Sequence, residues 1–257
     1  MKQFHFLSGL SRSGTTLLST ILNQNPKFQA SISGPLARFT RAIIEQSSAM
    51  SGYRHQCPAE KRKKIIKGIF DNYYDDPEKE VSFDTNRGWS LLTPFIKDLY
   101  PQSKLIICVR DPRWVLDSFE RLFRKNPYDK SLMIPDEFNG NVYERCDYLM
   151  RTDSTVGFAY RGICQAITSD EKSMIMLVEY EQLCKNPAGM IKAIYNFIDE
   201  PYYEHDFNNT ESSNEIFDED LNLKGLHDTR ATVTWEPRQT IIPPDLWEKY
   251  SNLEPWK

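Results

Sequence analysis

Residues 4–22, FHFLSGLSRSGTTLLSTIL, decide the fold of this chain. A short apolar run ends in a turn rich in glycine and serine, and leucine and isoleucine then recur at helical spacing, which predicts a strand, a loop and a helix. Gly9 and Gly14 stand in the G-x-x-x-x-G frame of a phosphate-binding loop. There the glycines let the backbone curl and aim its N–H groups, with the helix N-terminus, at an anion. The stretch therefore predicts a site for a phosphate-like group.

The loop differs at one position from the loop of proteins that hydrolyse ATP or GTP. Such a loop continues Gly-Lys-Ser/Thr, with the lysine on the β- and γ-phosphates. Here Gly14 is followed by Thr15 and Thr16, and the positive charge comes instead from Arg12 inside the loop. This favours a nucleotide donor other than ATP.

The rest of the chain alternates between apolar runs and amphipathic segments. Residues 105–109 are apolar throughout, which is typical of a central parallel strand. The alternation predicts an α/β fold, a P-loop-like three-layer sandwich with a central parallel sheet flanked by helices, in one domain over residues 1–257. Ligands of such sheets bind at the carboxyl ends of the strands. The polar groups expected to meet there are residues 11–16, 84–87, Arg110 and 179–181, with the loop 31–35 facing the same site.

Composition limits the classes of function. The chain has 257 residues and a net charge of −4, so there is no overall basic field to attract nucleic acid. No apolar run reaches the ~20 residues that cross a bilayer, and the first strand begins too close to Met1 for a signal peptide, so we expect a cytoplasmic protein. The five cysteines and four histidines lack the spacing of a disulfide framework or a metal site, and we predict no metal.

The loop also resembles that of a known family. Residues 11–17, Ser-Arg-Ser-Gly-Thr-Thr-Leu, are similar to the 5′-phosphosulfate loop of sulfotransferases that use 3′-phosphoadenosine-5′-phosphosulfate (PAPS). The Arg-Ser-Gly-Thr-Thr version is found in bacterial and tyrosylprotein-type members. The resemblance implies that Arg12 stabilises the leaving 5′-phosphate. It implies a donor-binding role for Arg12, Ser13, Gly14, Thr15, Thr16 and Leu17.

A second segment, residues 109–118, resembles the family's 3′-phosphate-binding motif. In that motif an arginine at a strand end and a serine eight residues later hold the phosphate together, and the matching residues are Arg110 and Ser118. An arginine that leaves a buried strand and a serine about two turns into the next helix can reach one anion. The alternative is a structural ion pair of Arg110 with Asp111 or Asp117.

Two later segments carry weaker resemblances. Residues 177–183 are similar to the family's Tyr-Glu-Asp-Leu segment, which makes Tyr180 a candidate to contact the adenosine; the alternative is a tyrosine at the edge of the core. Sulfotransferases often close over the nucleotide with a C-terminal basic loop. Arg238, beside Trp235, is the candidate for that loop, and an exposed arginine in a proline-rich tail is the alternative.

A hydroxyl acceptor needs a general base, and neither usual base of the family is present. Cytosolic members carry Lys-Thr-His before the 3′-phosphate strand, where this chain has residues 84–87, Asp-Thr-Asn-Arg. Tyrosylprotein-type members carry a glutamate after the first helix, where this chain has residues 31–35, Ser-Ile-Ser-Gly-Pro. Asp84 is the first candidate base, with Arg87 replacing the lysine; a turn cap or an ion pair with Arg87 is the structural alternative for Asp84. His227 is the second candidate base.

Together the motifs predict an enzyme that moves the sulfuryl group from PAPS to a hydroxyl, less readily an amine, and releases 3′-phosphoadenosine-5′-phosphate (PAP). The acceptor, a small molecule or a peptide, and the oligomeric state stay open. A P-loop kinase and a non-catalytic nucleotide-binding protein are the alternative functions. We expect a lid over residues 125–150 and a loop region over 205–257, in which the acidic stretch 211–220 is a mobile, solvated loop.

Overall fold

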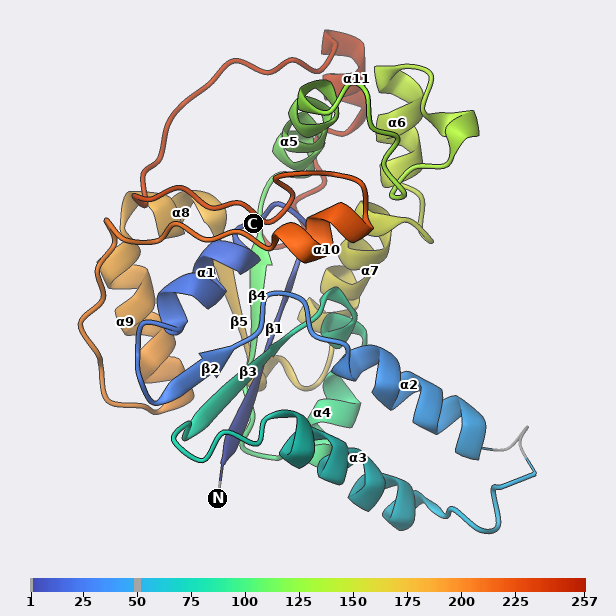
Figure 1. Cartoon of the computed structure of the whole chain (residues 1–257), viewed down its shortest axis with the longest axis vertical. Helices are drawn as coiled ribbons and strands as arrows, with labels where there is room; N and C mark the ends of the chain where they lie inside the picture. Colours follow the sequence, from blue (N-terminus) through green and yellow to red (C-terminus); the bar gives the residue numbers. More distant parts are fainter. Residues whose placement is uncertain (1, 49–51) are drawn as a thin grey trace.

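Five parallel strands form one sheet at the centre of the protein (Figure 1). The computed structural model describes residues 2–48 and 52–257. The strand order is β2-β3-β1-β4-β5, and every neighbouring pair is parallel. The strands are β1 (Gln3–Gly9), β2 (Phe28–Ala30), β3 (Val81–Thr85), β4 (Leu105–Val109) and β5 (Ile175–Glu179). The predicted α/β fold with a central parallel sheet is confirmed.

Helices cover both faces of this sheet. One face carries α1 (Thr15–Leu22), α8 (Tyr180–Lys185) and α9 (Pro187–Ile198). The other helices are α2 (Leu36–Ser47), α3 (Ala59–Tyr73), α4 (Thr93–Leu99), α5 (Pro112–Lys125), α6 (Val142–Leu149), α7 (Thr155–Ile167), α10 (Glu215–Asp220) and α11 (Pro244–Lys249). Three short 3₁₀ helices complete the set: η1 (Arg87–Leu91), η2 (Asp136–Phe138) and η3 (Lys172–Met174).

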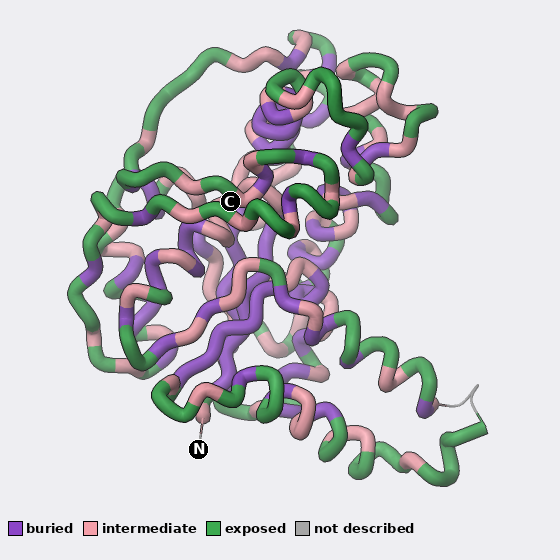
Figure 2. The backbone as a smooth tube through the Cα atoms, in the orientation of Figure 1, coloured by how far each residue is buried: buried purple, intermediate pink, exposed green. Residues whose placement is uncertain are grey.

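The alternation of side chains along the strands creates two cores. In β4, Ile106 and Cys108 pack toward α1, α8 and α9, whereas Leu105, Ile107 and Val109 pack toward the opposite face. All five of these residues are buried, which explains the unbroken apolar run. In Figure 2 the strands β1, β3 and β4 accordingly form continuously buried stretches of the trace.

Three segments in and beside the sheet have an irregular pattern. Residues 87–99 form η1 followed by α4 and not one continuous helix, because Pro94 lies in the first turn of α4, where a proline starts a helix rather than continues one. Ile65 is 41% exposed, so it is not part of the buried face of α3. Strand β2, with three residues, is too short to have produced a periodic signal.

The acidic stretch 211–220 is also more ordered than expected. It contains the helix α10, and Asp218 within it is only 2% exposed. The expected lid, residues 125–150, comprises an irregular segment with η2 and then α6. The backbone N–H of Leu132 in this segment donates to the carbonyl oxygen of Leu221, 3.0 Å away, so the segment and the C-terminal region lie side by side.

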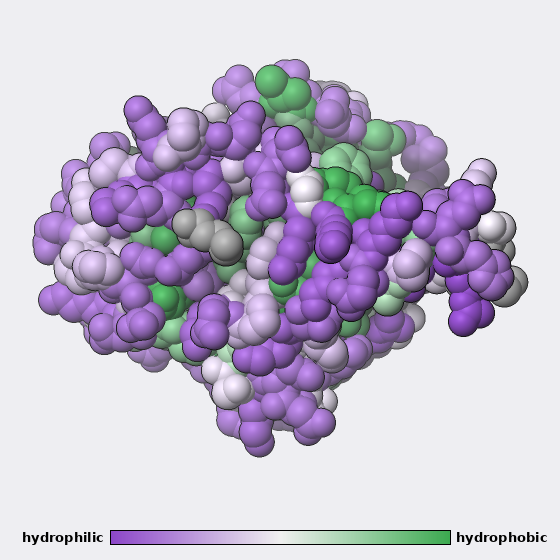
Figure 3. Space-filling model, turned by 90° about the horizontal axis from the view of Figure 1, so that it is seen from below, coloured by the Kyte–Doolittle hydropathy of each residue, from purple (hydrophilic) through white to green (hydrophobic). Residues whose placement is uncertain are grey.

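The two ends of the sheet differ in character. At the amino ends of the strands, hydrophilic side chains cover most of the surface, with apolar side chains showing only in places (Figure 3). At the carboxyl ends, loops and the C-terminal region surround a cavity. None of the helices in the described part of the chain combines the length and apolar character needed to cross a membrane.

Candidate active site

The glycine loop between β1 and α1 forms the floor of the cavity. Gly9 and Gly14 have φ values of 151° and 94°, which side chains disfavour. A Cβ on Gly9 would lie 2.3 Å from the carbonyl oxygen of Cys108, so the loop packs against β4 only because a glycine stands there. Gly14 is the N-cap of α1 and no side chain caps the helix, which leaves its first N–H groups facing the cavity.

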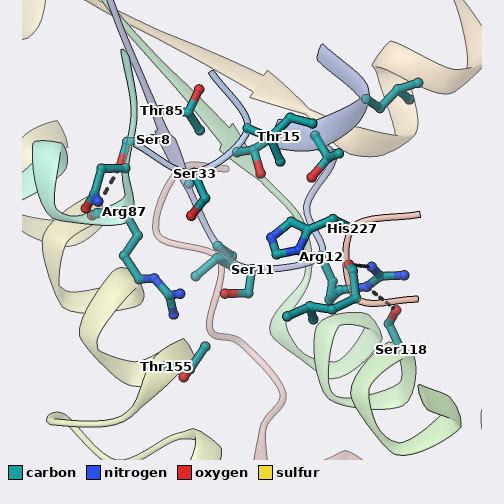
Figure 4. Close-up of a pocket in the computed structure, with 18 of the residues that line it drawn as sticks. Ser8, Ser11, Arg12, Thr15, Ser33, Thr85, Arg87, Ser118, Thr155 and His227 are labelled. Atoms are coloured by element: carbon teal, nitrogen blue, oxygen red, sulfur yellow. Dashed lines mark hydrogen bonds between the residues drawn. The ribbon is translucent and has the colours of Figure 1, made fainter. Parts of the chain in front are cut away.

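The cavity has a volume of about 840 Å³ and gathers segments that lie far apart in the sequence. Its walls contain most of the predicted site residues, namely Arg12, Gly14, Thr15, Thr16, Leu17, Arg87, Arg110, Ser118, Tyr180, His227 and Arg238. Figure 4 shows several of these side chains projecting into the cavity from different elements. Ser13 and Asp84 are not part of the walls. Seven arginines and two aspartates of the described chain line it, so the walls are strongly positive.

Ser13 shapes the loop instead of facing a ligand. Its hydroxyl donates to the carbonyl oxygens of Leu10, 2.6 Å away, and Cys108, 2.9 Å away, and the residue is fully buried. The side chain therefore ties the loop to itself and to β4.

Arg12, Arg110 and Ser118 come together at one end of the cavity. The Nε of Arg12 donates to the Ser118 hydroxyl, 3.1 Å away, and another guanidinium nitrogen donates to the carbonyl oxygen of Leu226. Arg110 donates to the carbonyl oxygen of Arg12 at 3.0 Å, and its guanidinium lies 4.4 Å from the centre of the Tyr180 ring. Arg110 makes no ion pair with Asp111 or Asp117, which removes that structural alternative.

Within this cluster Arg110 has no carboxylate partner. The Nε of Arg110 is buried and has no hydrogen-bond partner among the described residues. Burial lowers the pKa of Arg110 to about 10; Tyr180 opposes this effect, and Arg238 and Arg12 add to it. The guanidinium is thus charged at neutral pH in a site that repels cations. A buried, unpaired donor of this kind is costly unless an anion accepts from it.

Arg238 reaches the same end of the cavity from the C-terminal region. Its guanidinium pairs with the buried carboxylate of Asp117 on α5, 2.6 Å away, and lies 5.6 Å from the centre of the Trp114 ring. Its side chain is 32% exposed, so it is partly enclosed. Trp235 packs edge-on against Tyr180 with 6.3 Å between the ring centres.

His227 is held by an aspartate that the sequence did not single out. The Nδ1 of His227 lies 2.6 Å from Oδ1 of Asp218, and Oδ2 of Asp218 accepts from the backbone N–H of His227 at 3.1 Å. The ring of Phe217 packs edge-on against the imidazole. Because Asp218 occupies Nδ1, the nitrogen left for the cavity is Nε2, and the ring projects between Ser11 and Thr15 in Figure 4.

Asp84 does not face the cavity, which argues against it as the base. Its carboxylate accepts from the hydroxyl of Tyr74 and from Nε1 of Trp89, each at 2.7 Å, and is fully buried. Burial raises the pKa of Asp84 to about 6, and these two hydrogen bonds partly oppose the shift. The structural alternative of a pair with Arg87 is also absent. The turn is capped by Asn86, whose side chain accepts from the N–H of Gly88.

Arg87 stands on the other side of the cavity from Arg12. Its carbonyl oxygen accepts from the Ser8 hydroxyl at 3.2 Å, which anchors η1 to β1. The guanidinium projects toward Thr155, away from Arg12 and Ser118 (Figure 4). Burial lowers the pKa of Arg87, and Arg38 lowers it further. No hydrogen bond or ion pair joins the guanidinium to any of the residues that the structure describes.

Apolar side chains also line the cavity. They include Leu132 and Met133 from the segment expected to be a lid, Phe158 from α7, and Phe217 from α10. The loop at residues 31–35 contributes Ile32 to Pro35, as predicted. Over the described residues, no group of three or more histidine, cysteine, aspartate or glutamate side chains could hold a metal ion.

Solved structures with a similar fold include two sulfotransferases and a retinol dehydratase. The sulfotransferase from Alicyclobacillus acidocaldarius superposes with a TM-score of 0.54 at 14% identity, covering 86% of this chain and 90% of that one. The sulfotransferase domain from the curacin biosynthetic pathway gives 0.54 at 16% identity, with 98% and 92% covered. Retinol dehydratase, in a complex with retinol and PAP, gives 0.52 at 15% identity, with 100% and 80% covered. At these identities the likeness concerns the fold.

The sequence comparisons are more decisive about the family. Among curated proteins, none matches this chain. A model of the Sulfotransferase family matches residues 5–204, which include the glycine loop, Arg110, Ser118 and Tyr180. Because this match covers well over half of the 257 residues, the protein belongs to the sulfotransferase family.

Proposed function

We propose that this protein uses PAPS as its donor and transfers the sulfuryl group to a hydroxyl of a small-molecule acceptor, releasing PAP. The observation that carries the proposal is the buried, unpartnered Nε of Arg110, in a cluster with Ser118, Arg12 and Arg238. This cluster shares one cavity with the glycine loop. A nucleotide with a phosphate at both the 3′ and the 5′ position fits two anion sites in one cavity.

In this proposal the two sites divide the donor between them. The N–H groups at the start of α1, with the hydroxyls of Thr15 and Thr16, bind the 5′-phosphosulfate. Arg110 and Ser118 bind the 3′-phosphate, with Arg238 adding charge. Tyr180, whose ring lies against Gly14 and under Arg110, packs on the nucleoside.

Arg12 has to change partners for its proposed role. The guanidinium contacts Ser118 and Leu226, on the side of the 3′-phosphate cluster. To neutralise the leaving 5′-phosphate it gives up these contacts, and its position within the loop keeps it close enough to do so. The incoming 3′-phosphate favours the exchange, because it takes over the hydroxyl of Ser118.

His227 is the proposed general base, and Asp218 positions it. PAPS supplies an activated sulfuryl group, and catalysis then depends on alignment and charge, as in phosphoryl transfer. A bond forms between the acceptor oxygen and sulfur while the bond from sulfur to the bridging oxygen breaks. Nε2 of His227 takes the acceptor's proton, and the Asp218 carboxylate stabilises the imidazolium through Nδ1.

The two alternative functions have less support. A kinase would need a cation on the γ-phosphate in place of the absent loop lysine, and the sulfotransferase match speaks against it. A purely nucleotide-binding protein has no use for an imidazole fixed by a buried carboxylate and turned toward the cavity. The His227–Asp218 pair therefore favours an enzyme.

Titration and turnover test the proposal together. The protein is titrated calorimetrically with PAP and, separately, with ATP and Mg²⁺; we expect micromolar binding of PAP and far weaker binding of ATP. The protein is then incubated with PAPS and pooled small-molecule hydroxyl compounds, and mass spectrometry follows the formation of PAP and of a product heavier by one sulfuryl group. A preference for ATP with Mg²⁺ would overturn the proposal.

A further inference from the structure

One part of the cavity wall has the features of an anion site but does not belong to the donor cluster. Arg87 projects its guanidinium toward Thr155, the first residue of α7 (Figure 4). The guanidinium has no hydrogen bond or ion pair with any described residue. Arg87 is partly buried, so its guanidinium loses part of its hydration without gaining a counter-charge. Such an arrangement is explained when an anionic ligand completes it.

Ser154 supplies a second unsatisfied group at the same place. The residue is 7% exposed and lines the cavity, and its hydroxyl is buried without a hydrogen-bond partner. It is the N-cap of α7, with extended backbone angles, φ −97° and ψ 174°. A serine at this position usually accepts from an N–H of the first turn, but here no side chain caps the helix. The hydroxyl and the first N–H groups of α7 therefore have no hydrogen-bond partner among the described residues.

The charges around Arg87 keep this place distinct from the donor cluster. Burial lowers the pKa of Arg87 and Arg38 lowers it further, whereas the charged neighbours that act on Arg110 are Arg12 and Arg238. The carboxylate of Asp153, which also lines the cavity, is paired with Arg151 at 3.2 Å. Positive charge thus accumulates on both sides of the cavity, with the imidazole of His227 between them in Figure 4.

We propose that Arg87, the hydroxyl of Ser154 and the N-terminus of α7 form a binding site for an oxyanion carried by the acceptor, with Arg38 adding charge at its edge. The inference rests on the proposed function, because it needs the donor at the other end of the cavity. The acceptor is then a small molecule with two functional ends: a hydroxyl that reaches His227 and a carboxylate, phosphate or sulfate that reaches Arg87. The apolar side chains of Met133 and Phe158 line the same cavity and suit the carbon skeleton between these ends.

Residue-specific amide shifts test this site without knowledge of the acceptor. Isotope-labelled protein is first saturated with PAP, and chemical-shift changes at the backbone amides of Thr15 and Thr16 report that PAP is bound. Inorganic sulfate, inorganic phosphate and acetate are then titrated separately. We expect at least one of them to shift the amides of Thr155 and Val156 saturably, and the order of affinity distinguishes a phosphate-like group from a carboxylate.

Three variants make the test specific. Arg87→Met should weaken this anion binding about tenfold or more, and Ser154→Ala about threefold, because they remove a charged and a neutral donor. Arg161→Met, on the exposed side of α7, removes the same charge and should leave binding unchanged. Thermal unfolding checks that each variant is folded. Arg87→Met should not lower the midpoint, because it removes a partly buried charge that has no partner.

The outcomes separate the two proposals. If PAP fails to shift the loop amides, the proposed function is wrong, while the anion titration still reports on α7. If PAP binds but none of the three anions shifts the α7 amides, the inference is wrong and the proposed function stands. The inference also fails if Arg87→Met leaves the anion affinity unchanged, or if the anions shift only the loop amides.

Discussion

Replacing Arg110 by alanine should separate the contribution of the 3′-phosphate from that of the rest of the nucleotide. The variant removes a guanidinium whose Nε is buried and unpartnered next to Ser118 and Arg12. A hydrogen bond to a charged group contributes roughly 1.5–3 kcal/mol. An arginine fork on a phosphate makes two such bonds that are not fully additive. We therefore expect PAP to lose about 3 kcal/mol, on the order of a hundredfold in affinity.

Adenosine 5′-phosphate, which lacks the 3′-phosphate, is the ligand with which PAP is compared. Its affinity should change by less than about 1 kcal/mol in Arg110→Ala, since only the packing of the guanidinium on Tyr180 is lost. Calorimetric titration of both nucleotides against wild type and variant completes a thermodynamic cycle. One step of the cycle removes the 3′-phosphate from the ligand, and the other removes the arginine side chain from the protein.

A matched control is available on α5, the helix that follows Arg110. Arg113 also stacks on an aromatic ring, that of Trp247 at 4.9 Å, but it pairs with Asp111 and is not part of the cavity walls. Arg113→Ala should leave the affinity for both nucleotides unchanged. Equal losses for PAP and adenosine 5′-phosphate in Arg110→Ala would refute the assignment of Arg110 to the 3′-phosphate.

Three further predictions concern the base, the buried carboxylate and the loop. His227→Asn should lower the rate of PAP formation from PAPS about 10²- to 10⁴-fold while PAP affinity stays within about twofold; a rate near wild type would exclude His227 as the base. Because the pKa of Asp84 is raised to about 6 in the folded protein, its stabilising contribution is full below about pH 4 and is lost as pH rises toward 6. In urea unfolding, the free energy of unfolding of wild type minus that of Asp84→Asn should fall by roughly 3 kcal/mol between about pH 4 and pH 6. A free-energy difference that does not change with pH would contradict the raised pKa. Ser13→Ala, which leaves two buried carbonyl oxygens without their hydroxyl donor, should lower the free energy of unfolding by about 1–3 kcal/mol, and an unchanged urea midpoint would show that the hydroxyl does not fix the loop.

Local sequence patterns were sufficient to predict which residues form the proposed donor side of the cavity. The glycine loop and the segment from Arg110 to Ser118 each fit within a strand, a turn and the start of one helix, so the spacing alone places their functional groups. Parallel strands bring their carboxyl ends to one edge of the sheet, and for this reason both segments were expected to meet. The contact between Arg12 and Ser118 bears out that expectation.

Side-chain direction at a strand end was harder to predict. The apolar pattern of β3 suggests an end at Phe83, but the strand continues to Thr85 and pairs Asp84 with Phe6 of β1. Successive residues of a strand point to opposite faces, so this short extension turns Asp84 into the core while Thr85 lines the cavity.

The sequence by itself determined the parallel α/β sheet, the phosphate loop and the family, because each depends on short segments with a regular period or a fixed spacing. Only the tertiary structure decided which other groups line the cavity. The pairing of His227 with Asp218 brings together two residues of the irregular C-terminal region. Arg87 and Ser154 line one cavity although they are distant in the sequence. Their geometry follows from how the C-terminal region and α7 pack over the sheet, and no repeat or spacing along the chain encodes it.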